Sequence, residues 1–314
     1  MRIMNRHVKA FLLLLALCVC LTGCKAKETD DAPQTAEHKT AVTTQPVATP
    51  EEAPQTAVQS DEDKPTQAEL PQDTAQDALA QKVEALRQTA AQTGGTWSIG
   101  VIAPEETACT AANSQPMQAA SLIKLYVAAC VERSRTALQA QEQYAGETGT
   151  LLLNMLSQSD NEATNTLTRR LGGGDADAGM AVVNAYCREQ GYADTSMGRL
   201  MLDFSAQTDN YTSVRDCCMF LRAVLNGEVT GADEILSALK QQVRTGKIPA
   251  GVPSGVQTAN KTGELDTVEN DAAVVWGANG PYVLCVMSGD LTSPAAAREQ
   301  ITQISSELYA FLAQ

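Results

Sequence analysis

The sequence predicts an α+β fold, in which an antiparallel sheet is flanked by N- and C-terminal helices and packs on a separate all-helical subdomain. Two observations predict this class. Strand-like segments occur in one early and one late group, with a long helical block between them. An amphipathic helix precedes the first group, and another follows the second. Strands grouped in this way are typical of α+β folds, and the cleft between sheet and helices could hold a site.

The early group comprises one helix and two strands. Apolar residues recur at helical spacing over 74–92, and Gly94-Gly95 provides a stop for this helix. Side chains alternate in character over 97–101, which predicts a strand, and we expect a second strand over 107–112.

The middle of the chain is expected to be helical. Residues 151–156 are apolar nearly all round, as in a buried helix, and the stripe through 163–171 ends at Gly172-Gly173-Gly174. The other predicted helices cover 122–131, 183–191 and 214–225.

Strands return in the last quarter of the chain. We expect them at 257–262, 272–276 and 282–287. A final helix carries one apolar face, formed by Ile301, Ile304, Leu308 and Phe311.

The N-terminus resembles a bacterial lipoprotein signal over residues 1–24. A basic start is followed by the apolar run 10–21, which is shorter than the roughly 18 residues that span a bilayer. The run ends in Leu21-Thr22-Gly23-Cys24, a lipobox pattern in which Cys24 becomes the lipidated residue; the alternative is an ordinary signal peptide beside a chance cysteine. We expect an extracytoplasmic protein, anchored to the bacterial cell membrane only through this lipid.

Residues 25–75 are rich in Thr, Pro, Gln and Glu and nearly lack large apolar side chains. Such a segment cannot bury enough surface to offset its conformational entropy, so we expect a disordered linker. The domain itself is expected over 76–314.

Composition excludes several classes of function. A formal net charge of −14 argues against nucleic acid and against a polybasic membrane surface. The six cysteines beyond Cys24 form no CxxC motif, and the only two histidines, His7 and His38, precede the domain. We therefore expect no metal site. Spacing does not settle the pairing of the cysteines, and we expect mostly buried free thiols. We also expect no cofactor and a monomer.

Three short motifs carry the chemistry. Ser121-Leu122-Ile123-Lys124 places a hydroxyl at the first turn of a helix, with an amine one turn away on the same face. A serine hydrolase without histidine needs another base, and a lysine can serve if its pKa falls. The alternative is a helix-capping serine followed by a surface lysine.

Ser159-Asp160-Asn161 lies between two predicted helices, and Lys261-Thr262-Gly263 ends a predicted strand. Ser159 could relay a proton, Asn161 could bind a substrate carbonyl, and Gly263 could let a substrate backbone approach. The alternatives are a helix cap for the first motif and a strand end for the second.

With these motifs in this order, the chain resembles the class A β-lactamases and related penicillin-recognising serine hydrolases over about 76–313. The resemblance implies the β-lactamase/transpeptidase-like fold. It also implies roles for individual residues: Ser121 as acylated nucleophile, Lys124 as its base, Ser159 as proton shuttle, Asn161 and Thr262 as substrate-positioning groups, Lys261 as a positive charge, and the backbone N–H groups of Ser121 and Glu264 as an oxyanion hole.

Three departures from that family qualify the resemblance. The stretch 197–210 lacks the glutamate that activates the deacylating water, and Asp203 is either a substitute base or a loop-stabilising carboxylate. The interval between Ser121 and Ser159 is short, which predicts a trimmed helical subdomain. The arginine that grips a substrate carboxylate is missing after Gly263, and Lys247 is a candidate substitute.

The sequence therefore predicts a serine acyl hydrolase that forms an acyl-enzyme with β-lactams or acyl-peptide-like small molecules, with deacylation in doubt. The alternatives are a penicillin-binding, DD-peptidase-like or esterase protein, and a non-catalytic surface-binding module on the same fold.

Overall fold

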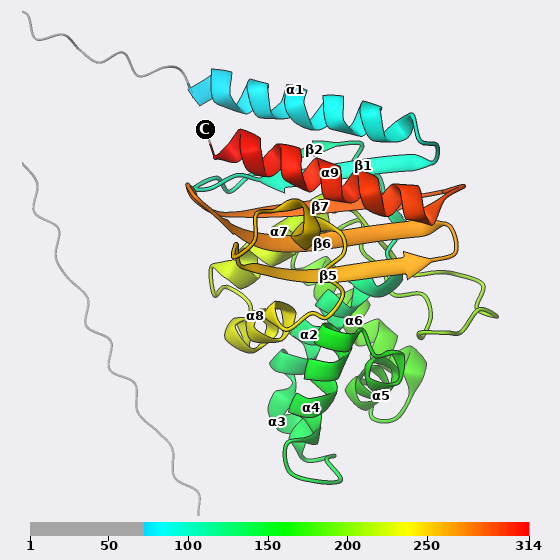
Figure 1. Cartoon of the computed structure of the whole chain (residues 1–314). Helices are drawn as coiled ribbons and strands as arrows, with labels where there is room; N and C mark the ends of the chain where they lie inside the picture. Colours follow the sequence, from blue (N-terminus) through cyan, green and yellow to red (C-terminus); the bar gives the residue numbers. More distant parts are fainter. Residues whose placement is uncertain (1–71, 314) are drawn as a thin grey trace, which may run out of the picture. The chain divides into compact units, whose positions relative to one another are not determined.

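The computed structural model describes residues 72–313, so the lipobox, Cys24 and nearly all of the expected linker lie outside the described residues. One sheet, ordered β2-β1-β7-β6-β5 with every neighbouring pair antiparallel, forms the centre of the domain (Figure 1). Its strands are β1 (Thr96–Ile102), β2 (Thr110–Ala112), β5 (Thr258–Leu265), β6 (Val268–Gly277) and β7 (Gly280–Gly289). The strands of the two sequence groups join where β1 pairs with β7.

Helices cover both faces of this sheet. The terminal helices α1 (Gln72–Ala91) and α9 (Pro294–Leu312) lie together on one side, and the helical block lies on the other (Figure 1). That block contains α2 (Lys124–Arg133), α3 (Arg135–Gln139), α4 (Glu147–Leu153), α5 (Asn161–Leu171), α6 (Ala176–Glu189), α7 (Val214–Leu225) and α8 (Ala232–Lys240). The predicted α+β fold is confirmed.

The remaining elements are short. Two strands, β3 (Met117–Gln118) and β4 (Tyr211–Thr212), pair as a separate ribbon. Three helical turns complete the chain: η1 (Ala120–Ile123), the π-helical η2 (Asn154–Gln158) and η3 (Ile248–Gly251). No helix within residues 72–313 has both the length and the apolar run that a membrane span requires.

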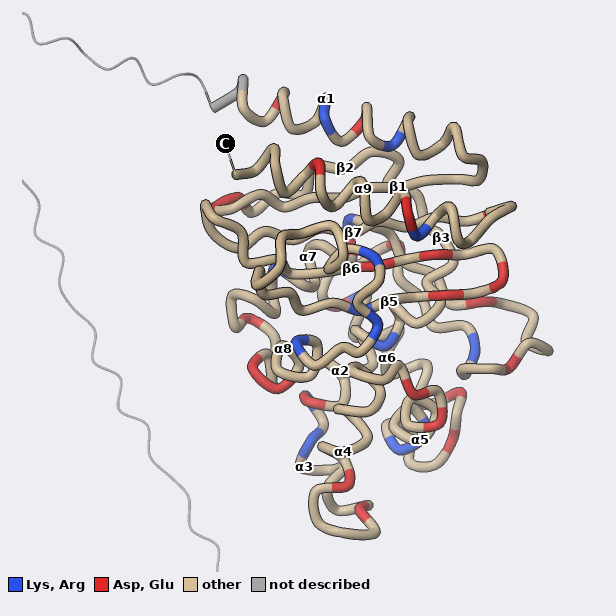
Figure 2. The backbone as a smooth tube through the Cα atoms, viewed as in Figure 1, with Lys and Arg blue, Asp and Glu red and all other residues tan. Residues whose placement is uncertain are grey.

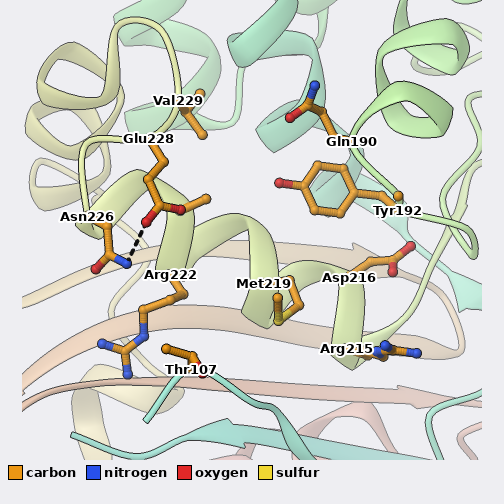
Figure 3. Close-up of a pocket in the computed structure, with 12 residues that line it drawn as sticks. Thr107, Gln190, Tyr192, Arg215, Asp216, Met219, Arg222, Asn226, Glu228 and Val229 are labelled. Atoms are coloured by element: carbon orange, nitrogen blue, oxygen red, sulfur yellow. Dashed lines mark hydrogen bonds between the residues drawn. The ribbon is translucent and has the colours of Figure 1, made fainter. Parts of the chain in front are cut away.

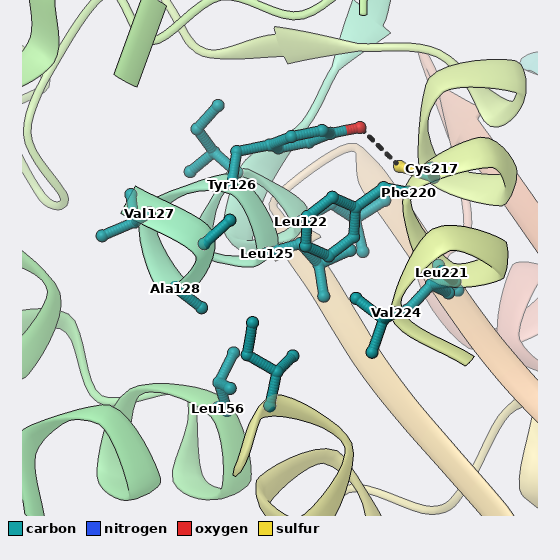
Figure 4. Close-up of a cluster of buried hydrophobic side chains, with 14 of the residues drawn as sticks. Leu122, Leu125, Tyr126, Val127, Ala128, Leu156, Cys217, Phe220, Leu221 and Val224 are labelled. Carbon is teal, nitrogen blue, oxygen red and sulfur yellow. Dashed lines mark hydrogen bonds between the residues drawn. The ribbon is translucent and has the colours of Figure 1, made fainter. Parts of the chain in front are cut away.

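Two hydrophobic cores follow from this layering. Trp97, Ile99 and Val101 of β1 face α1 and α9, whereas Ile102 belongs to the core beneath the helical block. In the core beneath the helical block, the Tyr126 ring packs against the Phe220 ring, with centroids 5.1 Å apart, and the Tyr126 hydroxyl donates to Cys217 Sγ (Figure 4). This core joins α2 to α7 and so fixes the helix that follows Ser121.

The expected strand at 107–112 forms only over its last three residues, and α8 was not predicted. The N-cap of α8 is Gly231, which has a φ of +71° and no side chain to accept a hydrogen bond from the first turn. The Ser, Thr, Asp or Asn that usually marks a helix start in a sequence is therefore missing. All six cysteines of the domain are free and five of them are buried, which confirms that expectation.

Candidate active site

Ser121 lies inside the turn η1, which continues directly into α2. The residue before it, Ala120, has a φ of +46°, a left-handed conformation that is uncommon without glycine. The backbone on this side is held from two directions: Asn270 Nδ2 donates to Gln118 O at 2.9 Å, and Ala119 N donates to Asn210 O at 2.8 Å. Neighbouring strands and loops therefore hold this strained turn in place.

Lys124 is fully buried, so it is not the surface lysine of the alternative interpretation. Its Nζ donates to Ser159 O at 2.7 Å, to Ser159 Oγ at 3.2 Å and to Asn161 Oδ1 at 2.8 Å. Within the described residues no hydrogen bond joins this amine to Ser121 Oγ. Lys124 thus connects the first two motifs through Ser159.

Burial lowers the pKa of Lys124 to about 7. The Asp160 carboxylate opposes this shift, and the Arg244 guanidinium adds to it. An amine with such a pKa is substantially neutral at physiological pH and can accept a proton.

The second motif divides into a cap and a functional group. Asp160 is the N-cap of α5, because its Oδ1 accepts from Ala163 N at 2.8 Å. Ser159 instead follows the π-helical turn η2 and has a φ of +61°. This backbone directs its hydroxyl between two lysines.

The second of these lysines is Lys261 on β5. It is fully buried, and its Nζ donates to Ser159 Oγ at 2.9 Å and to Thr262 O at 2.7 Å. Burial, with Lys124 close by, holds the pKa of Lys261 well below its usual value. Two amines from segments far apart in the chain therefore converge on one hydroxyl.

Position 263 must be a glycine because the backbone of residues 119–121 packs directly against it. A Cβ at this position would lie 2.7 Å from Ala119 O and 3.3 Å from Ser121 N. The absence of a side chain lets β5 pack directly against the turn that carries Ser121.

A pocket of about 70 Å³ contains Ser121 together with Asn161 and Glu264. Its other wall is largely apolar and comes from the loop 197–210 and from Leu265. Met201 lines this wall and is fixed by Asn165, which accepts from Met201 N at 2.8 Å and donates to Met201 O at 3.1 Å. The loop is closed by the ion pair between Arg199 and Asp209, 2.6 Å apart.

Asp203 does not face this pocket, so its candidacy as a water base is wrong. It is exposed and accepts hydrogen bonds from Ser205 N and Ser205 Oγ, at 3.1 and 2.6 Å. The Ser205 hydroxyl lowers the pKa of the Asp203 carboxyl. Asp203 is therefore the loop-stabilising carboxylate of the alternative interpretation.

Lys247 is not a free cation either, which corrects its expected role as a carboxylate-binding residue. It is 2% exposed, and its Nζ pairs with Glu269 Oε2 at 2.6 Å and with Glu264 Oε1 at 3.1 Å. Arg244 is an exposed cation near the site, and it pairs with Glu264 Oε2 at 2.6 Å. Sequence reasoning missed Arg244 because it belongs to no motif, and the fold alone brings it near Lys124.

A larger cavity, of about 440 Å³, lies between the end of α6 and α7 and is lined by none of the motif residues (Figure 3). Arg222, on its wall, donates to Ala103 O at 2.6 Å and so joins α7 to the end of β1. The small pocket is lined instead by Ser121 of the first motif and Asn161 of the second, and the third motif joins them through the Lys261–Ser159 hydrogen bond, which makes that pocket the candidate active site.

Comparisons with known proteins agree with this geometry. Residues 132–312 match the Beta-lactamase2 family, described as the beta-lactamase enzyme family; the match begins after Ser121 and Lys124. No curated protein matches the chain.

Several solved structures share the fold. The beta-lactamase from Sphaerobacter thermophilus DSM 20745 is 23% identical, with 74% of this chain and 97% of that chain covered and a TM-score of 0.64. A class A beta-lactamase representative from Bacteroides cellulosilyticus DSM 14838 is 20% identical, with coverages of 74% and 98% and a TM-score of 0.64. PBP-A is 25% identical, with coverages of 74% and 96% and a TM-score of 0.65.

The family match covers more than half of the chain, and the sheet and helices have the same arrangement as in these structures. The family and the fold support a hydrolase of the β-lactam type. The chain therefore belongs to the beta-lactamase enzyme family.

Proposed function

We propose that this protein is a serine acyl hydrolase that forms an acyl-enzyme on Ser121 with β-lactams or related acyl substrates and releases it slowly. The observation that carries this proposal is the Ser159 hydroxyl, which accepts from the buried amines of Lys124 and Lys261 beside Ser121. A hydroxyl between two amines of lowered pKa is suited to passing protons.

In the proposed acylation, Ser121 Oγ attacks the substrate carbonyl carbon while Lys124 Nζ takes the hydroxyl proton. Ser159 then gives its own proton to the leaving nitrogen and is reprotonated by the lysines, so the C–N bond breaks and an ester on Ser121 remains. The Lys124 amine is held on Ser159 and Asn161 in the free protein, so we expect it to contact Ser121 Oγ only once substrate is bound.

We assign the oxyanion hole to the backbone N–H groups of Ser121 and Glu264. The close approach at Gly263 supports this assignment, because it places the end of β5 beside Ser121 N. Asn161 and Thr262 would position the substrate. Donors held in advance by a strand and a turn need no reorganisation when charge develops on the carbonyl oxygen.

We expect slow hydrolysis of the acyl-enzyme because the pocket wall facing Ser121 is largely apolar. Met201 lines the pocket on the loop 197–210, which contains no glutamate. A thioether cannot take a proton from water, so the ester would lack a general base from this loop.

A penicillin-binding, DD-peptidase-like function is the second candidate. Met201 favours it, because a pocket wall without a general base would leave the acyl-enzyme as a persistent adduct. One solved structure similar to this chain is a leucine-to-glutamate variant of PBP-A as an acyl-enzyme complex with penicillin G. An esterase and a non-catalytic surface-binding module are the remaining alternatives. A buried amine of lowered pKa argues against the non-catalytic module, since a scaffold gains nothing from the cost of burying it.

We further propose that the protein acts outside the cytoplasm as a monomer, anchored through lipid on Cys24 and a linker over 25–75. The basis is the lipobox pattern and the composition of the linker. Its partners would be small acyl compounds and not nucleic acid.

The decisive experiment follows colour release from a chromogenic cephalosporin and the intact mass of residues 25–314 in the same incubation. Sustained turnover supports a β-lactamase, and a persistent adduct supports the penicillin-binding alternative. Ser121→Ala should abolish both signals, whereas Ser237→Ala, at an exposed serine of α8, should retain them. If several β-lactams and simple esters give neither turnover nor adduct, acyl-enzyme formation is ruled out for these substrates.

A further inference from the structure

Another pocket, of about 360 Å³, lies beside the candidate active site, and three of its six lining residues are cations. Its walls include Arg244, Lys247 and Arg298, together with Thr262 of the third motif. Glu264 lines both this pocket and the pocket of Ser121. Glu264 is the lining residue that the two pockets share, so a group on a substrate held at Ser121 that extends toward these cations meets its side chain.

Glu264 divides its two carboxylate oxygens between two of the cations. Oε2 lies 2.6 Å from Arg244 Nη1, and Oε1 lies 3.1 Å from Lys247 Nζ. Glu269 completes the row, with Oε2 at 2.6 Å from Lys247 Nζ and Oε1 at 2.8 Å from Arg298 Nε. Each cation of this pocket is thus already paired with a carboxylate of the protein.

The strand register explains why these charges gather here. Glu264 on β5 is directly opposite Glu269 on β6, and acidic residues are grouped at this hairpin end of the sheet (Figure 2). Two facing carboxylates repel each other unless a cation lies between them, and Lys247 Nζ has this position. Burial favours the neutral form of Glu264, but Lys247 and Arg244 hold its pKa below the usual value, so it is ionised at neutral pH.

We propose that the Glu264 carboxylate is an internal anion that occupies the cationic pocket beside Ser121, and that it selects acyl substrates carrying a neutral group instead of a free carboxylate at that position. The inference rests on the proposed acylation of Ser121 and narrows its substrate class. An incoming carboxylate must displace Glu264 from Arg244 and Lys247 or lie against its charge. An ester or amide of the same shape meets neither penalty.

The test uses a matched substrate pair, benzylpenicillin and its methyl ester, which differ only in the free carboxylate. The readout is the ratio of their second-order acylation rate constants, carboxylate over ester, from the intact mass of residues 25–314. We expect a ratio below one for the unmodified protein and a ratio at least tenfold higher for Glu264→Gln, which removes the charge and keeps the shape. A ratio that is unchanged or lower in Glu264→Gln overturns the inference.

Two further variants separate this role from a general loss of charge or of fold. Asp266→Asn removes one negative charge from an exposed residue near the same hairpin that forms no ion pair within the described part of the chain, so its ratio should match the unmodified protein. Arg244→Gln changes an exposed residue and leaves Glu264 less neutralised, so its ratio should fall. If adducts form but the ratio in Glu264→Gln equals that of the unmodified protein, this inference alone is overturned. If no adduct forms with either substrate, the proposed function is overturned as well.

Discussion

At the scale of single residues, burial determines what the lysines can do. Lys124 and Lys261 are completely buried and share the Ser159 hydroxyl, whereas Lys247 is buried within a row of ion pairs. The first two have few opposite charges nearby, and burial lowers their pKa values. The same residue type therefore serves as a candidate base at one position and as a structural counter-ion at another.

The pKa of Lys124 predicts how acylation depends on pH. Only the neutral amine accepts a proton, so the acylation rate constant should rise about tenfold per pH unit below the pKa of about 7 and level off above it. The measurement is adduct formation with a neutral ester between pH 5 and 9.

Two variants check that Lys124 is the titrating group. Asp160→Asn should move the midpoint to lower pH, because the Asp160 charge raises the pKa of Lys124, while asparagine still caps α5. Asp175→Asn changes the corresponding cap of α6 and should leave the midpoint in place. A midpoint that stays in place in Asp160→Asn would show that Lys124 is not the titrating group.

Met201 predicts the lifetime of the acyl-enzyme. Met201→Glu places a carboxylate on the wall of the Ser121 pocket, so we expect the adduct to decay about 100-fold faster, within the range for a positioned general base. Decay is followed by intact mass after removal of free substrate. Met201→Gln, which is polar but not basic, should decay like the unmodified protein; equal acceleration by both variants would rule out general-base action.

At the scale of elements, the site depends on how β5 packs against η1. The glycine at the end of the third motif allows this contact, since a Cβ at Gly263 would lie within 2.7 Å of Ala119 O. Helices with clear apolar stripes, such as α5 and α7, could be predicted from sequence, but the approach of a strand to a turn more than a hundred residues earlier could not.

Gly263→Ala should therefore damage both stability and activity. We expect a loss of about 1–3 kcal/mol from overpacking and roughly 100-fold slower acylation because Ser121 is displaced. Chemical denaturation and adduct formation measure the two effects. Gly277→Ala is the matched strand variant, with 3.4 Å to the nearest atom, and should change both much less; similar losses in the two variants would contradict the packing argument.

At the scale of the whole molecule, strands from the two ends of the domain sequence form one sheet, and the helical block lies between them along the chain. The three motifs come from both the sheet and the helical block. Ser121 and Ser159 belong to the helical side and Lys261 to the sheet. A site built in this way exists only when the sheet and the helical block are packed together, which the hydrophobic core shared by the helices and by buried residues of β5, β6 and β7 ensures.

The proposed lipid anchor predicts where the intact protein is found. With Cys24 lipidated, the full chain should sediment with bacterial membranes, and Cys24→Ser should release it into the soluble extracytoplasmic fraction. Fractionation with immunoblotting measures this, and Cys109→Ser in the domain is the matched control. Membrane association of the Cys24→Ser protein would contradict lipid anchoring.

The sequence by itself determined the order of the motifs, the fold class, the lack of histidine in the domain and the missing glutamate of the loop 197–210, because these depend on residue identity and local periodicity. Only the tertiary structure decided that Lys124 and Lys261 converge on Ser159, that Asp203 does not line the Ser121 pocket, and that Glu264 binds Arg244 and Lys247. The reason is physical: the charge state and availability of a side chain depend on its burial and on neighbours from distant segments, and Lys261 and Ser159 are 102 residues apart.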